Sequence, residues 1–321
     1  MGSNFKNLYT SNNPPLEVIL MRGSNLESIH KVHAVISDKK GRVLMCAGNP
    51  EYKSFIRSAL KPFQTIPFVS SGAASKINDS SKSIALSCGS HSGSKLHTRE
   101  AFKILWEYNI DIHNLKCPLK NTSPLEHNCS GKHAAFLATC KKLSWPIESY
   151  LKGDHPLQVE IFRIISELLE IPDANIYAAR DDCGAPTLYM KLLDMAKLYS
   201  LLSSSDNAEL EQISRAMTTN PIMISDHNRF DTEIIQSSHG QVISKGGAEG
   251  IQCLGKINEG IGLALKVEDG SKRAKHAVGL HLLKQLEWIS DLRIQDIEDK
   301  ILKFPEGVQI QVKGQLKFQE S

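Results

Sequence analysis

The sequence lacks any long hydrophobic run. Its stretches of Val, Ile and Leu are interrupted by polar residues well before the roughly 20 apolar residues that a membrane-spanning helix requires. Residues 1–18 contain no apolar segment of the kind found at the centre of a secretory leader. We therefore expect a cytoplasmic protein that does not act at a membrane.

A large excess of charge of one sign is also missing. The 38 Lys and Arg residues nearly balance the 35 Asp and Glu residues, which leaves a net charge of +3. A balanced chain of this kind produces no long-range field that would attract a polyanion. Nothing in the composition indicates a nucleic-acid partner.

The cysteines do not form the pattern of a disulfide framework. There are seven, an odd number, and they are scattered through the chain. This distribution is typical of proteins from a reducing compartment. Some of the thiols are therefore available as free groups or as metal ligands.

Hydrophobic patterning divides the chain into a strand-rich part at each end and a helix-rich part between them. Short strands separated by tight polar turns are predicted near the N-terminus, and strands cut by glycines return after the middle of the chain. A helix and a last strand follow. The predicted strands are residues 17–23, 30–38, 41–48, 241–247, 251–257, 261–269 and 308–318, and the predicted helices are residues 58–71, 94–108, 131–143, 155–169, 185–202 and 272–289.

This order predicts an α+β fold. One antiparallel sheet is built from both chain ends and flanked by helices, with a mainly helical lobe inserted. We expect residues 1–321 to form a single catalytic unit, in which residues 15–55 and 220–321 make the sheet lobe and residues 56–219 the helical lobe.

The stretch RSALKPFQ, residues 57–64, places Ser58 three residues before Lys61. On a helix, this spacing puts both side chains on one face, where a lysine with a lowered pKa can act as a base for the serine. Pro62 favours a helix that begins near Lys61, with the serine at its mouth. Taken alone, the tetrapeptide is more often a simple helix start.

Three other segments are candidates for the same site. SCGSHSGS, residues 87–94, carries Ser90 but by itself reads as a polar turn before a helix. SKGGAEG, residues 244–250, combines a lysine with paired glycines that would let backbone approach a ligand, or it is a bulged strand. GLALKVEDG, residues 262–270, contains a strand lysine, Lys266, that its position alone would leave facing water.

Two segments carry potential metal ligands. HNCSGKHAAF, residues 127–136, contains Cys129 and His133 at a spacing of four, and RDDCGAP, residues 180–186, contains Asp181 and Cys183. Thiolate, imidazole and carboxylate groups all suit zinc. The spacing alone favours Cys129 with His133, and it matches no standard zinc-finger pattern.

Taken in order, these segments resemble the L-asparaginase II family of the type first described from rhizobia. Each match is short, but their shared order makes the resemblance specific. The matching stretches are residues 57–64, 87–93 followed by His97, 128–134, 155–158, 181–186, 229–232, 245–250 and 263–270.

The resemblance implies a serine β-lactamase-like and glutaminase-like fold, and hydrolysis of L-asparagine to L-aspartate and ammonia. Carried over by position, it assigns two serine and lysine pairs and four zinc ligands, and it makes a homodimer the expected assembly. The pairs are Ser58 with Lys61 and Ser90 with Lys266, and the ligands are Cys129, Lys132, Asp181 and Cys183.

A lysine ligand must be a neutral amine, so the resemblance departs here from the spacing, which favoured His133. We keep His133 as a substrate contact and expect Arg57 to join it in holding the substrate's α-carboxylate. The Ser58 N–H and a backbone N–H near Gly247 or Ala248 are the expected oxyanion donors. Asp182 stands where the family is expected to have a glycine.

The sequence leaves open which serine is acylated. Ser58 as nucleophile is our working hypothesis, with at least one lysine neutral near pH 7 because two adjacent cations repel each other. Two other functions fit the same segments. One is a different serine amidase, a β-lactamase or a peptidase on the same scaffold, and the other is a non-enzymatic zinc protein.

Overall fold

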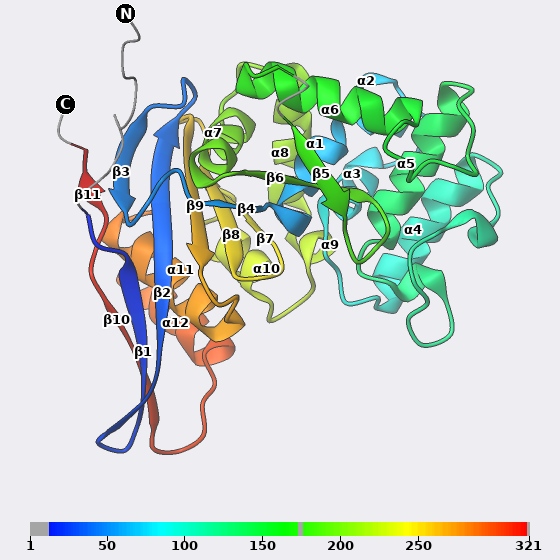
Figure 1. Ribbon diagram of the computed structural model, residues 1–321. Coiled ribbons are helices and arrows are strands. Elements are labelled where there is room, and N and C mark those ends of the chain that lie inside the picture. The colour runs from blue at the N-terminus through cyan, green and yellow to red at the C-terminus, as the bar shows by residue number, and fades with distance from the viewer. Residues whose placement is uncertain (1–12, 173–175, 320–321) are drawn as a thin grey trace, which may run out of the picture.

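The computed structural model describes residues 13–172 and 176–319. The N-terminal segment on which the leader prediction rests lies mostly outside these ranges. Within them, no helix is long and apolar enough to cross a membrane. Figure 1 shows a large sheet on one side of the molecule and a helical lobe on the other.

The large sheet is antiparallel and takes strands from both ends of the chain. Its strand order is β10-β1-β2-β9-β8-β7, and β3 pairs with both β2 and β11. The strands are β1 (Leu16–Arg22), β2 (Asn25–Asp38), β3 (Val43–Ala47), β7 (Val242–Gly246), β8 (Ile251–Lys256), β9 (Ile261–Val267), β10 (Val308–Lys313) and β11 (Lys317–Phe318). The predicted sheet from both ends is thus confirmed.

The helical lobe lies between the two sets of strands in sequence. Its helices, with the short 3-10 turns labelled η, are η1 (Arg57–Leu60), α1 (Lys61–Gln64), α2 (Ile66–Ser70), η2 (Ala74–Lys76), α3 (Ser80–Cys88), α4 (Lys95–Glu107), η3 (Ile112–Asn114), η4 (Pro124–Glu126), α5 (Ser130–Lys142), α6 (Pro156–Leu169), α7 (Leu192–Ser203), α8 (Ala208–Thr219), α9 (Pro221–Ile224) and α10 (Phe230–Ser237). Two more helices, α11 (Lys272–Gln285) and α12 (Asp291–Ile301), lie between β9 and β10 in sequence.

Three of the predicted helices are wrong in extent. The segment 58–71 is broken into η1, α1 and α2, because Pro62 and Pro67 supply no backbone N–H. The segment 185–202 starts as a strand and becomes helical only at Leu192. The helix predicted over 272–289 ends at Gln285.

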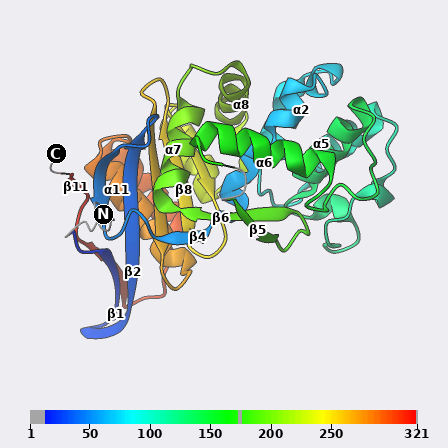
Figure 2. The ribbon, with the colours of Figure 1, turned by 45° about the horizontal axis from the view of Figure 1, so that its top comes forward.

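The strand that precedes Leu192, β6, belongs to a second, three-stranded sheet inside the helical lobe. Its order is β4-β6-β5, from β4 (Lys53–Phe55), β5 (Tyr177–Arg180) and β6 (Pro186–Lys191). Figure 2 shows it extending from beside the large sheet into the helical lobe. It anchors η1, because the Ile56 N–H donates to Leu188 O at 3.0 Å.

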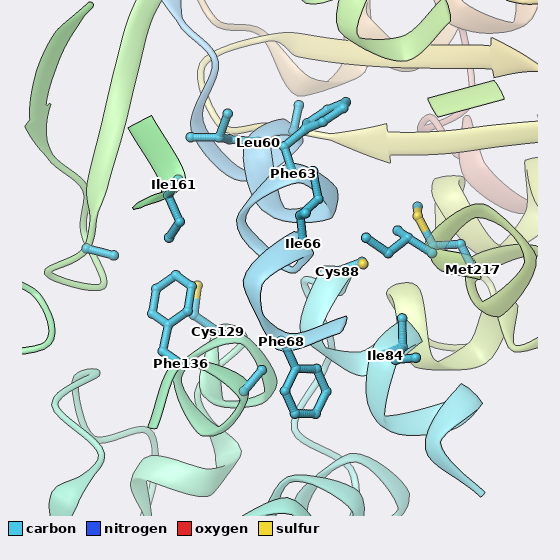
Figure 3. Close-up of a cluster of buried hydrophobic side chains, with 14 of the residues drawn as sticks. Leu60, Phe63, Ile66, Phe68, Ile84, Cys88, Cys129, Phe136, Ile161 and Met217 are labelled. Atoms are coloured by element: carbon cyan, nitrogen blue, oxygen red, sulfur yellow. The ribbon is translucent and has the colours of Figure 1, made fainter. Parts of the chain in front are cut away.

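Both faces of the large sheet are covered, which explains why its inner strands β8 and β9 are buried along nearly their whole length. One face packs on the helical lobe through residues such as Val35, Cys253 and Ala264. The other packs on α11 and α12 through residues such as Ala34 and Leu265. Figure 3 shows the first of these cores around α1 and α2, where Phe63, Ile66 and Phe68 meet side chains from the helices around them.

Candidate active site

Ser58, the first candidate serine, lies in η1 just before the first residue of helix α1, as predicted. Arg57 has φ of 54°, a left-handed conformation that is strained for a residue with a side chain. Its N–H donates to Thr187 Oγ1 at 3.1 Å, which holds this conformation. Ser58 is half-buried and lines a cleft of about 900 Å³. Lys61, in contrast, is fully buried as the first residue of α1.

The Lys61 amine is directed toward Ser90. It donates to Gly89 O, to Asn128 O at 3.2 Å and to Ser90 Oγ at 3.1 Å. Three acceptors match the three N–H groups of an ammonium. Among the described residues, no hydrogen bond joins Lys61 to the Ser58 hydroxyl.

Ser90 follows the C-terminus of α3 in a tightly packed turn. Its N–H donates to Ile224 O at 2.7 Å. A Cβ on the preceding Gly89 would lie 2.4 Å from Met223 O, so only glycine allows this approach. Ser90 is half-buried and lines the same cleft as Ser58.

The second lysine at Ser90 is Lys245, on β7. Its Nζ lies 3.0 Å from Ser90 Oγ and donates to Gly246 O at 2.7 Å. The Ser90 hydroxyl therefore lies between two lysine nitrogens. It has a single proton, so it can accept from Lys61 while it donates to the lone pair of a neutral Lys245.

The environment of Lys245 makes that neutral form more accessible than it is for a free lysine. Burial lowers its pKa from 10.5 to about 8; the nearby Asp231 carboxylate opposes this shift, and the Lys61 and Lys275 cations add to it. A group with this pKa can both accept and return a proton near neutral pH.

The structure does not place Lys266 beside Ser90. Its Nζ donates to Val267 O and, at 3.3 Å, to Glu268 O. Its strand, β9, is an inner strand separated from β7 by β8, and neighbouring strands lie roughly 5 Å apart. One strand, β8, therefore lies between Lys266 and Lys245, and the expected pairing with Ser90 is not formed. Lys266 is also not on an edge strand.

The sequence contains a signal for Lys245 that the predicted site does not include. The paired glycines of residues 244–250 predict a close approach of backbone to a ligand, or a bulged strand, and they assign no role to Lys245. In penicillin-recognising enzymes a Lys-Thr-Gly element follows the Ser-x-x-Lys motif later in the chain. A strand lysine followed by glycine, downstream of Ser-x-x-Lys, resembles this arrangement. That combination points to Lys245 rather than Lys266.

The residues after β7 approach the Ser58 segment closely. A Cβ on Gly247 would lie 2.8 Å from Ile56 O. The Gly247 N–H donates to Ile251 O at 2.8 Å and so is already used. The Ala248 N–H has no acceptor among the described residues, and Ala248 lines the cleft. Of the two expected donors on this segment, Ala248 is the one with a free N–H.

Arg57 is held by two carboxylates. Its Nε donates to Asp181 Oδ1 at 2.8 Å and its Nη2 to Asp182 Oδ2 at 2.6 Å. Burial by itself would lower the Arg57 pKa, but the two aspartates raise it above its ordinary value. The Asp181 carboxylate, expected as a metal ligand, thus points to Arg57. The Asp182 side chain is 90% exposed.

The remaining expected ligands come together in a buried cluster. Cys129 precedes α5, Lys132 is in its first turn, and Cys183 is in the loop between β5 and β6. Lys132 Nζ lies 3.2 Å from Cys183 Sγ. A hydrogen bond from Cys129 and the Lys132 cation lower the Cys183 pKa, and the same hydrogen bond and burial raise that of Cys129.

His133 lies in the interior beside this cluster, and it is not among the residues that line the cleft. Its Nδ1 is 2.7 Å from the Tyr150 hydroxyl, while its buried Nε2 has no hydrogen-bond partner among the described residues. Burial lowers the His133 pKa to about 4, partly offset by Cys183.

In the described ranges no three His, Cys, Asp or Glu side chains converge on one point as a metal site. Two sulfurs and a lysine amine nevertheless meet next to the orphaned His133 nitrogen. Sulfur and nitrogen donors are those that zinc prefers, so the cluster fits that ion.

The family model of L-asparaginase II matches residues 18–318. The chain belongs to the L-asparaginase II family. No curated protein matches it in sequence.

Two solved structures are similar to this chain, at low sequence identity. Mglu in its glutamate form is 12% identical and has a TM-score of 0.44, with 80% of this chain and 61% of that chain covered. A Bacillus glutaminase in the presence of 4.3 M NaCl is 11% identical and has a TM-score of 0.35, with 80% of this chain and 91% of that chain covered. The chain thus spans less than two thirds of the length of Mglu.

Proposed function

We propose that the protein is an amidohydrolase that converts L-asparagine to L-aspartate and ammonia. The observation that carries this proposal is the position of Ser90 Oγ, 3.1 Å from Lys61 Nζ and 3.0 Å from Lys245 Nζ, in a cleft that Ser58 also lines. Membership of the L-asparaginase II family supports the choice of substrate.

Ser58 is the proposed nucleophile and Ser90 the proton relay. The Ser58 oxygen attacks the side-chain carbonyl carbon, and its proton passes by way of Ser90 to the neutral Lys245 amine. That proton then returns to the departing nitrogen, which leaves as ammonia and gives an aspartyl ester on Ser58. Water attacks the ester by the same route and releases L-aspartate.

The oxyanion formed in both steps needs backbone donors. The Ala248 N–H, which has no described acceptor, and the Ser58 N–H in the first turn of η1 are suited to this role. Arg57 is the proposed partner of the α-carboxylate. It can take this role on its outer nitrogen when the exposed Asp182 side chain moves away.

Zinc is the proposed metal, held by Cys129, Lys132 and Cys183. When bound, it would fix the loop between β5 and β6 against α5 and so hold Asp181 and Arg57 in place. Lys132 must then bind as a neutral amine. A homodimer stays a prediction.

Ammonia release from L-asparagine and from L-glutamine, with and without added zinc, tests the proposal. We expect Ser58→Ala to lose at least about 10³-fold in kcat and Ser90→Ala to lose about 10²–10⁴-fold with substrate binding retained. An ester trapped on Ser58 by rapid acid quench, located by peptide mass, would identify the nucleophile. Parental turnover by correctly folded Ser58→Ala would refute this mechanism.

A second candidate is hydrolysis of a β-lactam or a peptide. It is favoured by the combination of Ser-x-x-Lys at residues 58–61 with Lys-Gly-Gly at 245–247, which resembles the set used by penicillin-recognising enzymes. Hydrolysis of a chromogenic β-lactam without ammonia release from L-asparagine would decide for it.

A further inference from the structure

The segment RFDT, residues 229–232, has no role in the mechanism described above, yet it contains a buried carboxylate next to the catalytic strand. Asp231 lies in the first turn of α10 and is 8% exposed. Its Oδ1 accepts from Ser244 Oγ at 2.7 Å and from Gln252 Nε2 at 2.8 Å. Its Oδ2 accepts from the Gly246 N–H at 3.0 Å.

These contacts surround Lys245 in the sequence. Ser244 and Gly246 are its two neighbours on β7, and β7 is an edge strand of the large sheet. An edge strand has outward N–H groups that no neighbouring strand accepts. Asp231 accepts the one from Gly246 and so fixes the strand at the position of the catalytic lysine. Lys275 Nζ, from α11, donates to the next carbonyl, Gly247 O, at 3.1 Å.

Asp231 is also a counter-charge. Its Oδ2 lies 3.8 Å from Lys245 Nζ, and among the described residues it is the carboxylate that forms an ion pair with that lysine. The other titratable groups around Lys245 are cations or thiols. They are Lys61 from α1, Lys275 from α11, Cys88 from α3, Cys129 before α5 and Cys253 from β8.

We propose that Asp231 is a positioning residue, whose carboxylate clamps β7 on both sides of Lys245 and supplies the negative charge that keeps the Lys245 amine directed at Ser90. This inference depends on the function proposed above, because Lys245 is the base in that mechanism. A purely structural carboxylate would hold the strand but would not set the proton affinity of Lys245.

The test measures that proton affinity without using activity. The free energy of unfolding of the protein with Lys245 is compared with that of Lys245→Met across pH 4–11, once in the parent and once in an Asp231→Asn background. The two curves converge between the folded-state and the unfolded-state pKa of Lys245. Removing a facing charge at this distance is expected to move the lower limit of this window down by about 1–3 pH units, while the upper limit, which the unfolded chain sets, stays in place. The acid limb of the pH profile of kcat/KM should move in the same direction.

Glu233→Gln is the matched control. Glu233 is a second buried carboxylate of α10, but it accepts from Lys300 and from the Asn228 N–H rather than from β7. This variant should lower stability and leave the Lys245 window in place. An unchanged window in folded Asp231→Asn would overturn the proposal.

If Asp231→Asn does not fold, Asp231→Glu replaces it. The charge is kept but displaced by one methylene, so kcat should fall at least about 10-fold because the clamp is lost, with the acid limb near its parental pH. Parental kcat in Asp231→Glu would overturn the clamp. A parent that releases no ammonia would refute the proposed function, and the unfolding comparison would still decide the coupling of Asp231 to Lys245.

Discussion

Replacement of Lys245 by methionine should stabilise the protein at neutral pH while it removes activity. Lys245 has 0% exposure, and its pKa falls from 10.5 in the unfolded chain to about 8 in the fold. At about 1.4 kcal/mol for each pKa unit, burial of the protonated amine costs the folded state about 3 kcal/mol. Methionine has a similar length and carries no charge.

The difference in stability between Lys245→Met and the parent should depend on pH. Between about pH 8 and pH 10.5 the unfolded chain keeps a proton on Lys245 that the folded protein has lost, so stability rises with pH across this window. Above it both states are neutral and the penalty is gone. The advantage of Lys245→Met over the parent should therefore be about 3 kcal/mol below pH 8 and should vanish by about pH 10.5.

Urea unfolding followed by circular dichroism from pH 6 to pH 11 measures this difference. Packing effects of the methionine are independent of pH, so the slope of the difference curve is the readout rather than its offset. Lys141→Met, at an exposed position on α5, is the control and should give a flat curve. A flat curve for Lys245→Met would show that Lys245 has the same pKa in the folded and unfolded states, and the base proposed here would be wrong.

Three further changes test other parts of the site. Gly247→Ala puts a Cβ 2.8 Å from Ile56 O, so the backbone must shift; we expect a loss of about 1–3 kcal/mol in stability and at least about 10-fold in kcat. Asp182→Ala frees the outer nitrogen of Arg57, which should lower KM for L-asparagine several-fold and change stability by less than about 1 kcal/mol because that ion pair is exposed. Cys129→Ala should lose bound zinc on metal analysis of the purified protein.

Each of these has an outcome that contradicts it. Parental kcat in Gly247→Ala would mean that the approach to Ile56 does not position the oxyanion donors. An unchanged KM in Asp182→Ala would remove Arg57 from the substrate site. Cys140→Ala, on α5 but outside the cluster, is the control for zinc, and equal metal content in Cys129→Ala and in the parent would refute Cys129 as a ligand.

Much of the architecture could be predicted from local sequence patterns. Strand-like segments at both chain ends and helix-like segments between them indicated one sheet with a helical insert, because the period of hydrophobic residues reports which faces are buried. The boundaries that failed have local causes too. Pro62 and Pro67 divide the segment 58–71, and the β-forming residues after Pro186 delay the next helix until Leu192.

The sequence by itself determined the Ser-x-x-Lys pair at a helix start and the family to which the chain belongs, since both depend on residues close together in the chain. Only the tertiary structure decided which lysine meets Ser90. Lys245 and Lys266 are both strand lysines beside glycine-rich turns, and they differ in strand order: β7 is at the edge next to α10 and the Ser90 turn, while β9 is two strands away. Strand order depends on pairings between distant segments, which no local pattern contains, and the same pairings bring Asp231 to Lys245.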